Sequence, residues 1–256
     1  MDREVYQKII AKREFTQLPK RDVEKAYGFF ERRQTSDEEK IRLTRELLHK
    51  VFGAFGSRKL LSVKDKEAEW VLKKHLSTRE RLPFYRDIYK RILKGMGKQI
   101  RIIDLGAGVN GFSYGYFQEL GFTIDYLGIE AIAQFVDLMN YYFKKNKVNG
   151  KAVHLSLFEC EKIKRHIGQT KGEKIIFLFK TLDSLEMLEN NYSKKLLEEL
   201  TPLVDRVIIS FATESMIKRK KFRVKRKWIL DFIKERFRIL DDFELGPERF
   251  IIFCKG

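Results

Sequence analysis

A glycine-rich loop is the segment of this chain whose residue types and spacing best fit ligand chemistry. Residues 104–111 read DLGAGVNG and directly follow a short apolar run. Glycines at positions 106 and 108 let a backbone pass close to a ligand and adopt positive φ angles. With Gly111 they also match the dinucleotide fingerprint GxGxxG, which by itself is a weak signal. The loop therefore predicts a site for a nucleotide-like cofactor, with Gly106 and Gly108 among the binding residues.

Two acidic residues favour S-adenosylmethionine over a dinucleotide. Asp104 lies two residues before the first glycine, where its carboxylate can engage the ammonium group of the methyl donor, directly or through water. A pyrophosphate would be repelled there. Glu130 ends the next apolar run, 24 residues after Gly106, where a carboxylate can accept hydrogen bonds from both ribose hydroxyls. A nicotinamide-dependent oxidoreductase, supported by GxGxxG alone, is a weaker alternative.

Further ligand contacts are expected where the later strands end. In open α/β sheets, ligands bind at the carboxyl ends of the strands. Ser156 and Leu157 are expected to end the third strand and to flank an adenine. Phe179 and Lys180 end the fourth, at the mouth where the methyl group would be presented.

The chain lacks the usual signatures of acid, base or cysteine catalysis. The fourth strand is followed by Lys-Thr-Leu rather than by the [DNS]-P-P-[YFW] motif of amino-group methylation. Cys160 and Cys254 have neither the context of a cytosine-C5 nucleophile nor the spacing of metal ligands, so no metal site is expected. Guanine N7 already carries an in-plane lone pair and needs only orientation and proximity. We therefore expect positioning rather than catalytic residues, with candidates Phe179, Lys180 and Phe112.

Aromatic side chains in this region have two candidate roles. A target base must leave its stack to reach the methyl group, and Phe112, Tyr114 or Phe179 can hold it by stacking. A residue of this kind is more often part of the core than a stacking platform.

The elements that must carry this site alternate along the second part of the chain. Five apolar runs are separated by helical stretches, which predicts a parallel sheet covered by helices: Ile100–Leu105, Ile124–Glu130, Ala152–Leu157, Lys174–Phe179 and Val204–Phe211. Two last runs, Phe237–Phe243 and Arg249–Cys254, are joined by too few residues for a crossover helix and predict an antiparallel hairpin. The expected fold class is α/β, a Rossmann-like S-adenosylmethionine methyltransferase domain over residues 97–256.

Residues 1–96 are expected to form a helical extension. Their apolar residues recur at helical spacing, and Ser36 with Glu39 forms a capping-box pattern. The whole chain carries 53 Lys and Arg against 36 Asp and Glu, a net charge of +17, which favours a polyanionic partner. A thermophile-like charged surface is the alternative.

The basic excess is concentrated between residues 218 and 227. This segment, KRKKFRVKRK, follows the fifth strand and holds the RNA-binding candidates Lys218, Arg219, Lys220, Lys221, Arg223, Lys225, Arg226 and Lys227. The first residues, MDREVYQKII, contain no apolar signal segment, and no apolar run approaches the roughly 18 residues of a membrane span. We expect a cytoplasmic, soluble monomer without a membrane partner.

Four motifs in the same order resemble the 16S ribosomal RNA guanine-N7 methyltransferases that confer aminoglycoside resistance. They cover the chain from about residue 70 onward: HLSTRERL at 75–82, Asp104-x-x-x-Gly108-x-Asn110, the Phe179-Lys180 pair, and Ser210-Phe211-x-Thr213-x-Ser215.

The resemblance implies S-adenosylmethionine as cofactor and a helical N-terminal part that grips the small ribosomal subunit. It also implies that the first motif completes the cofactor site. Arg81 would pair bidentately with the cofactor carboxylate, and the segment His75, Ser77, Thr78 and Arg79 would pack near it. A helix-face salt bridge is the alternative role for the two arginines.

The sequence departs from the family pattern at two positions. These departures bear on the RNA target rather than on the class of enzyme. Gly111 stands where the family commonly has proline, and Glu214 stands where it has arginine, in a loop expected near RNA. The target nucleotide and a role in resistance therefore stay open. A transfer RNA substrate and a non-catalytic ribosome-assembly protein are the alternatives.

Overall fold

Short helices precede the sheet. The computed structural model describes residues 1–53, 60, 65–169, 172–213 and 226–256. Before the first strand it has α1 (Arg3–Ile10), α2 (Lys20–Gly28), α3 (Asp37–Leu48), the π-helical turn η1 (His49–Gly53), α4 (Ala68–Lys74), α5 (Leu76–Arg81), the 3₁₀ turn η3 (Leu82–Phe84) and α6 (Tyr85–Ile92). The capping pattern at Ser36 is confirmed, because its side chain accepts a hydrogen bond of 3.2 Å from the Glu39 amide at the start of α3.

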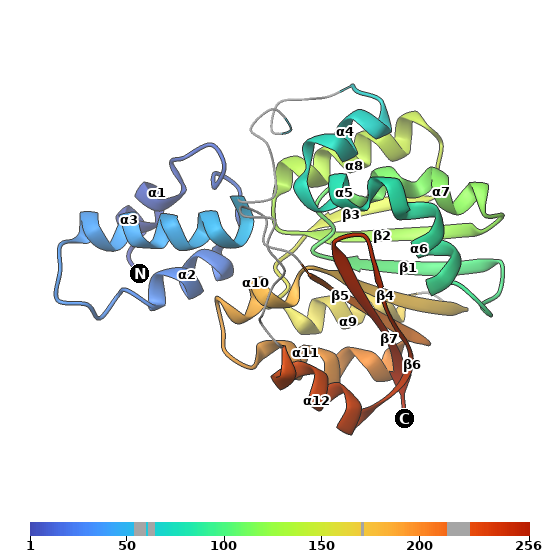
Figure 1. Cartoon of the computed structure of the whole chain (residues 1–256). Helices are drawn as coiled ribbons and strands as arrows, with labels where there is room; N and C mark the ends of the chain where they lie inside the picture. Colours follow the sequence, from blue (N-terminus) through green and yellow to red (C-terminus); the bar gives the residue numbers. More distant parts are fainter. Residues whose placement is uncertain (54–59, 61–64, 170–171, 214–225) are drawn as a thin grey trace.

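A seven-stranded sheet in the order β3-β2-β1-β4-β5-β7-β6 forms the centre of the molecule (Figure 1). Its strands are β1 (Gln99–Leu105), β2 (Thr123–Glu130), β3 (Gly150–His154), β4 (Glu173–Phe179), β5 (Arg206–Ala212), β6 (Phe237–Leu245) and β7 (Glu248–Lys255). The first five strands are parallel. Their central members read as nearly continuous apolar runs because helices cover both faces.

The expected terminal hairpin is present. β6 and β7 are antiparallel neighbours, and β7 inserts between β5 and β6 by pairing antiparallel with β5. The predicted α/β sheet that ends in an antiparallel hairpin is therefore confirmed.

Helices cover the two faces of the sheet (Figure 1). On one face lie α6, α7 (Tyr114–Glu119) and α8 (Ala133–Lys145); on the other lie α9 (Cys160–Gly168), α11 (Tyr192–Leu200) and α12 (Lys227–Arg236). The short elements η4 (Asn110–Ser113), α10 (Leu182–Glu186) and η5 (Thr201–Leu203) fill the connections. Among the described helices, none is long and apolar enough to cross a membrane.

The third strand is shorter than expected. We predicted it over Ala152–Leu157, but β3 ends at His154, which pairs with Glu130, the last residue of β2. With no further partner on β2, the chain leaves the sheet. Ser156 and Leu157 therefore lie in the loop after β3 rather than at its end.

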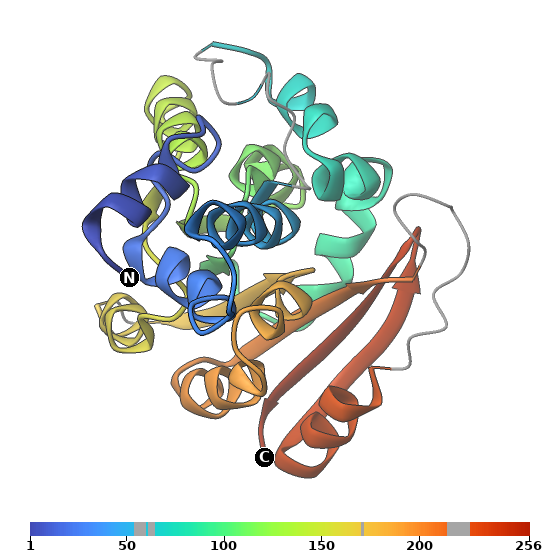
Figure 2. The same ribbon diagram turned by 90° about the vertical axis from the view of Figure 1, so that its left-hand side faces the viewer.

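Helices α1–α3 lie against the edge of the sheet where the parallel strands end. Figure 2 views the molecule from that side, with these helices in front of the sheet. The chain continues from α3 through η1, which contacts α10. The N-terminal helices are thus placed beside the edge at which α/β sheets bind ligands.

Candidate functional site

A cavity opens at the carboxyl ends of β1, β2 and β4. Its empty space, mouth included, is about 830 Å³. The wall combines residues from the strand ends, from α5, and from the N-terminal segment. Several expected cofactor residues line it: His75, Ser77, Thr78, Arg81, Asp104, Gly106, Gly108, Glu130, Leu157 and Phe179.

The glycine loop is shaped so that backbone, rather than side chains, forms one wall. Gly106 has φ +72° and Gly108 has φ +55°. A Cβ atom on Gly106 would lie 2.9 Å from the Thr181 side chain, and one on Gly108 would lie 2.9 Å from Nε2 of His75. Both conformation and space thus require glycine. The loop can therefore bring its backbone against a ligand.

Glu130 holds this loop from the end of β2. Its carboxylate accepts hydrogen bonds from the amides of Gly108 (2.7 Å) and Ile132 (2.8 Å). Burial raises the pKa of Glu130, against the lowering effect of these backbone hydrogen bonds. A carboxylate offers about four lone-pair sites, so Glu130 retains capacity to accept hydrogen bonds from ribose hydroxyls.

Asp104 is fixed from the opposite side of the loop. Its Oδ2 accepts hydrogen bonds from Nδ2 of Asn110 (2.7 Å) and from the hydroxyl of Tyr126 (2.5 Å). Burial raises the pKa of Asp104, while the two hydrogen bonds and Arg81 lower it. Both contacts use one oxygen, which leaves the other to meet an ammonium group.

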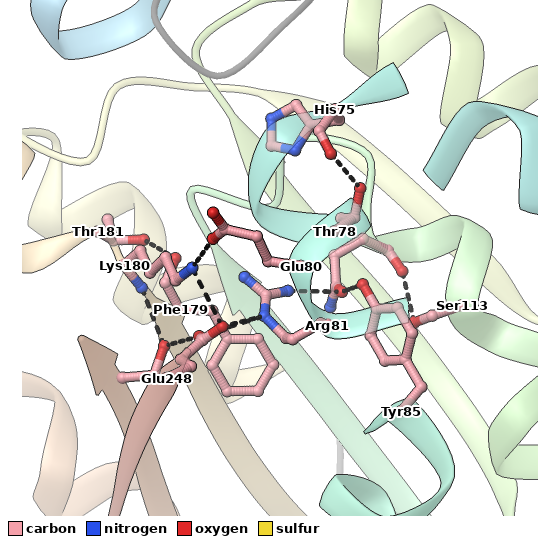
Figure 3. A network of polar contacts seen from close by, with 12 residues as sticks. His75, Thr78, Glu80, Arg81, Tyr85, Ser113, Phe179, Lys180, Thr181 and Glu248 are labelled. Atoms are coloured by element: carbon pink, nitrogen blue, oxygen red, sulfur yellow. Dashed lines mark hydrogen bonds and ion pairs between the residues drawn. The ribbon is translucent and has the colours of Figure 1, made fainter. Parts of the chain in front are cut away.

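Arg81 belongs to a buried ionic network (Figure 3). Its Nε lies 3.0 Å from Oε2 of Glu248, and its Nη1 donates to Oδ1 of Asn110 over 3.1 Å. The guanidinium lies over the Phe179 ring, 4.7 Å from its centroid. Among the described residues no hydrogen bond to Nη2 is found, so this nitrogen is the one available to a cofactor carboxylate.

Lys180 joins the same network from the end of β4. Its Nζ pairs with Glu80 and lies 3.4 Å from Oε2 of Glu248, while Ser210 donates to the other oxygen of Glu248. Lys180 is buried and adopts a positive φ of 57°. It lines the cavity together with Phe179.

His75 sits behind the glycine loop as a neutral ring. Burial lowers the pKa of His75 to about 3, and the charges of Arg81 and Lys180 lower it further. The ring meets Phe135 edge-on, with 5.8 Å between centroids. Because it is neutral at physiological pH and packed against Gly108, His75 shapes the loop rather than carrying charge.

Three predicted residues do not reach the cavity wall. Arg79 is exposed to solvent, and Ser156 is buried beneath the loop after β3, where its Oγ accepts a hydrogen bond of 3.1 Å from the Phe158 amide. Phe112 is a correction: its ring stacks on Tyr142 at 4.4 Å and belongs to the core. Tyr114 is likewise buried, with its hydroxyl bonded to the backbone of Ile124.

Most of the basic segment lies outside the described residues. This applies to Lys218, Arg219, Lys220, Lys221, Arg223 and Lys225, and also to Glu214 and Ser215. Arg226 pairs with Asp183 at 2.7 Å, and the exposed Lys227 lies 3.0 Å from Asp231. No cluster of His, Cys, Asp and Glu suited to a metal ion occurs in the described ranges.

Sequence reasoning missed three acidic residues of the site: Asp22, Glu80 and Glu248. Asp22 lines the cavity from α2, and the other two neutralise Arg81 and Lys180. Glu248 offered one weak signal, an acid at the start of an apolar run. Its partner Arg81 is 167 residues away in sequence, so only the fold reveals the pair.

A parallel sheet that ends in an antiparallel hairpin, with a glycine loop and two acids at its carboxyl edge, defines an S-adenosylmethionine-dependent methyltransferase. The model of the Ribosomal RNA methyltransferase (FmrO) family matches residues 46–251. The chain belongs to this family.

A curated relative agrees with this assignment. The 16S rRNA (guanine(1405)-N(7))-methyltransferase of Proteus mirabilis is 24% identical over 192 residues, which make up 72% of this chain and 64% of the relative. The chain thus matches less than two thirds of that protein's length.

Solved structures share the fold along nearly the whole chain. The 16S rRNA methyltransferase RmtF, solved in complex with S-adenosyl-L-homocysteine, has a TM-score of 0.78 at 20% identity, with 100% of both chains covered. The 16S rRNA methylase RmtB has a TM-score of 0.76 at 19% identity, covering 99% of this chain and 98% of its own. An rRNA methylase from Escherichia coli has a TM-score of 0.76 at 19% identity, with 99% of each chain covered.

Proposed function

We propose that this protein transfers a methyl group from S-adenosylmethionine to N7 of a guanine in small-subunit ribosomal RNA. The observation that carries the proposal is the cavity of Asp104, the glycine loop and Glu130 in a chain of the ribosomal RNA methyltransferase family. The relative's specificity for guanine N7 in 16S rRNA supplies the substrate.

The donor set of the cavity fits the proposed cofactor. Asp104 would hold the ammonium group through its second carboxylate oxygen, and Arg81 would hold the cofactor carboxylate through Nη2. Glu130 would accept hydrogen bonds from the ribose hydroxyls, and Leu157 would pack against the adenine. The loop at Gly106 and Gly108 has no room for a side chain, as close contact with a ligand requires.

Besides binding the cofactor, the enzyme has to position the guanine base against the methyl group. When bound, the cofactor supplies an electrophilic methyl group on a sulfonium sulfur. The guanine N7 lone pair forms the new N–CH₃ bond as the S–CH₃ bond breaks, and the positive charge moves to the purine ring. No proton is removed, so no general base is required. We assign Phe179 and Lys180 to the mouth of the cavity, where they orient the base.

Binding of the RNA is assigned to two regions. We propose that residues 1–96 form the RNA-binding extension of a methyltransferase domain over residues 97–256. α1–α3 lie in front of the sheet (Figure 2), and α2 contributes Asp22 to the cavity wall. The basic segment 218–227 follows β5, whose carboxyl end lies at the same edge. Its charges would contact phosphates rather than bases. We further propose that the protein acts as a monomer in the cytoplasm.

The test is transfer of labelled methyl from S-adenosylmethionine to purified 30S subunits, naked 16S rRNA and transfer RNA. We expect label in 30S subunits or 16S rRNA. Label confined to transfer RNA would keep the enzyme class and discard the substrate. Binding of cofactor without transfer to any of the three would favour a non-catalytic assembly role.

A further inference from the structure

One acid of the cavity wall comes from the N-terminal helices and has no role in the site described so far. Asp22 lies in α2, is 2% exposed, and lines the cavity together with Glu130 and Leu157. α2 is a helix of nine residues that is distant in sequence from the glycine loop.

Half of the Asp22 carboxyl group is unsatisfied. The nearby hydroxyl of Ser156 lowers the pKa of the carboxyl group, but Oδ2 is buried and has no hydrogen-bond partner among the described residues. Burying a polar atom without a partner costs folding free energy. Such an atom in a cavity wall therefore indicates a ligand that donates a hydrogen bond to it.

The neighbours of Asp22 identify which part of the cofactor it faces. Glu130, assigned to the ribose, is close enough to act on Asp22 through its charge. Ser156 lies in the loop after β3, next to Leu157 and Phe158, which line the cavity with apolar side chains. Apolar side chains suit the faces of a purine ring. An adenine ring seated against these apolar side chains would present its edge to Asp22.

The α2 helix is also fastened to this wall. Lys25, one turn after Asp22, pairs with Glu189 and lies over the ring of Phe158, 4.7 Å from its centroid. This seating holds Asp22 in the wall of the cavity.

We propose that Asp22 recognises adenine by accepting a hydrogen bond from its 6-amino group at Oδ2. An ionised carboxylate only accepts hydrogen bonds, and the 6-amino group is the donor on the outer edge of adenine. The inference rests on the proposed S-adenosylmethionine site. It makes α2 part of the cofactor site, so cofactor binding and seating of this N-terminal helix stabilise each other.

The test compares two ligands by calorimetry: S-adenosylhomocysteine and its analogue with hydrogen in place of the 6-amino group. The wild-type protein should bind the analogue at least about tenfold more weakly, because a hydrogen bond to a charged acceptor is lost. Asp22→Ala should bind the two ligands with nearly equal affinity. Asp22→Asn retains an acceptor oxygen and should keep part of the preference.

Glu24→Ala is the matched control. Glu24 is an exposed acid on the same helix, paired with Lys20, and should leave the wild-type ratio unchanged. Equal binding of both ligands by the wild-type protein would overturn the assignment of Asp22 even if every variant misfolded. Absence of S-adenosylhomocysteine binding by the wild-type protein would instead refute the proposed function, and the assignment with it.

Discussion

Buried acids dominate the cavity at the scale of single residues. Asp22, Asp104 and Glu130 line it, Glu248 lies behind Arg81 and Lys180, and all four acids are nearly inaccessible to solvent. Glu248 is neutralised by Arg81 and Lys180, whereas burial raises the pKa of Asp22, Asp104 and Glu130. The cavity therefore holds excess negative charge that a ligand with an ammonium group, hydroxyls and an amino group would relieve.

Asp22 should make the ligand-free protein less stable at higher pH. Burial raises its pKa to about 7 from 3.8, with Ser156 opposing and Glu130 and Glu159 adding to the rise. A raised folded-state pKa means that stability present at low pH is lost as pH increases to the folded value. Between pH 5.5 and 8 the resulting loss in the free energy of unfolding is roughly 2 kcal/mol.

The Asp22→Asn variant should lack this loss. Urea unfolding of both proteins at the two pH values measures the difference, and common contributions from other titrating groups cancel. An equal pH dependence of wild type and variant would show that Asp22 is not a buried, titrating carboxyl group.

Glu248 should be essential to stability because it neutralises a buried cation. Arg81 and Glu248 are 3% and 1% exposed. Glu248→Gln leaves a buried guanidinium without its counter-charge, which should lower the free energy of unfolding by about 3 kcal/mol.

Asp242→Asn provides the comparison for Glu248. It breaks the ion pair between Arg249 and Asp242 on the neighbouring strand, whose side chains are 36% and 33% exposed. That loss should stay under about 1 kcal/mol. If denaturant titration gave Glu248→Gln an equally small loss, the buried network would not hold the site together.

The place of the acids beside the glycine loop could be predicted, because it depends on local spacing in the sequence. Asp104 and Glu130 end strands, and strand ends are visible in a sequence. Glu80, Glu248 and Asp22 could not, because each acquires its role from residues that only tertiary packing brings near. Phe112 was misplaced for the same reason: nothing local distinguishes a ring that faces the cavity from one that packs on Tyr142.

At the scale of elements, most strands were predictable and one boundary was not. The apolar runs and the short turn predict both the parallel strands and the hairpin. The error at β3 arises because Leu155 and Leu157 continue the apolar pattern after β2 has ended at Glu130. Strand length depended on the partner rather than on the segment itself.

The turn from β1 to η4 should tolerate no side chain at Gly108. An alanine there would be strained at φ +55° and would meet His75 at 2.9 Å. We expect Gly108→Ala to weaken S-adenosylhomocysteine binding at least about tenfold, since the loop must shift away from its ligand-binding shape.

Gly115→Ala serves as the control for this loop. Gly115 lies in α7, and a Cβ atom there meets nothing within 4 Å. Helix propensity predicts a gain of about 0.5–1 kcal/mol in stability and unchanged binding. Unchanged calorimetric affinity in Gly108→Ala would mean that the loop does not form the cofactor wall.

At the scale of the whole molecule, charge should govern RNA binding. The net charge is +17, and the basic segment 218–227 holds eight of the 53 Lys and Arg residues. A plot of the logarithm of the RNA association constant against that of salt concentration should fall steeply, by about 0.7–0.9 per phosphate neutralised.

Changing Lys218, Lys220 and Lys225 to glutamine should flatten that slope by about 2. The same change at Lys144, Lys147 and Lys151, exposed residues near the amino end of β3, should alter it far less. Equal effects of the two triple variants in filter-binding titrations would place the RNA elsewhere than at the carboxyl edge of the sheet.

The most direct test of the account is chemical mapping of the methylated nucleotide. 16S rRNA from treated 30S subunits would be reduced with borohydride, cleaved with aniline and read by primer extension. Transfer to guanine N7 predicts a new cleavage at one guanine, in proportion to the methyl label, because N7 methylation makes that ring reducible and its backbone cleavable. Stoichiometric label without new cleavage would place the methyl group on another atom and contradict guanine-N7 transfer.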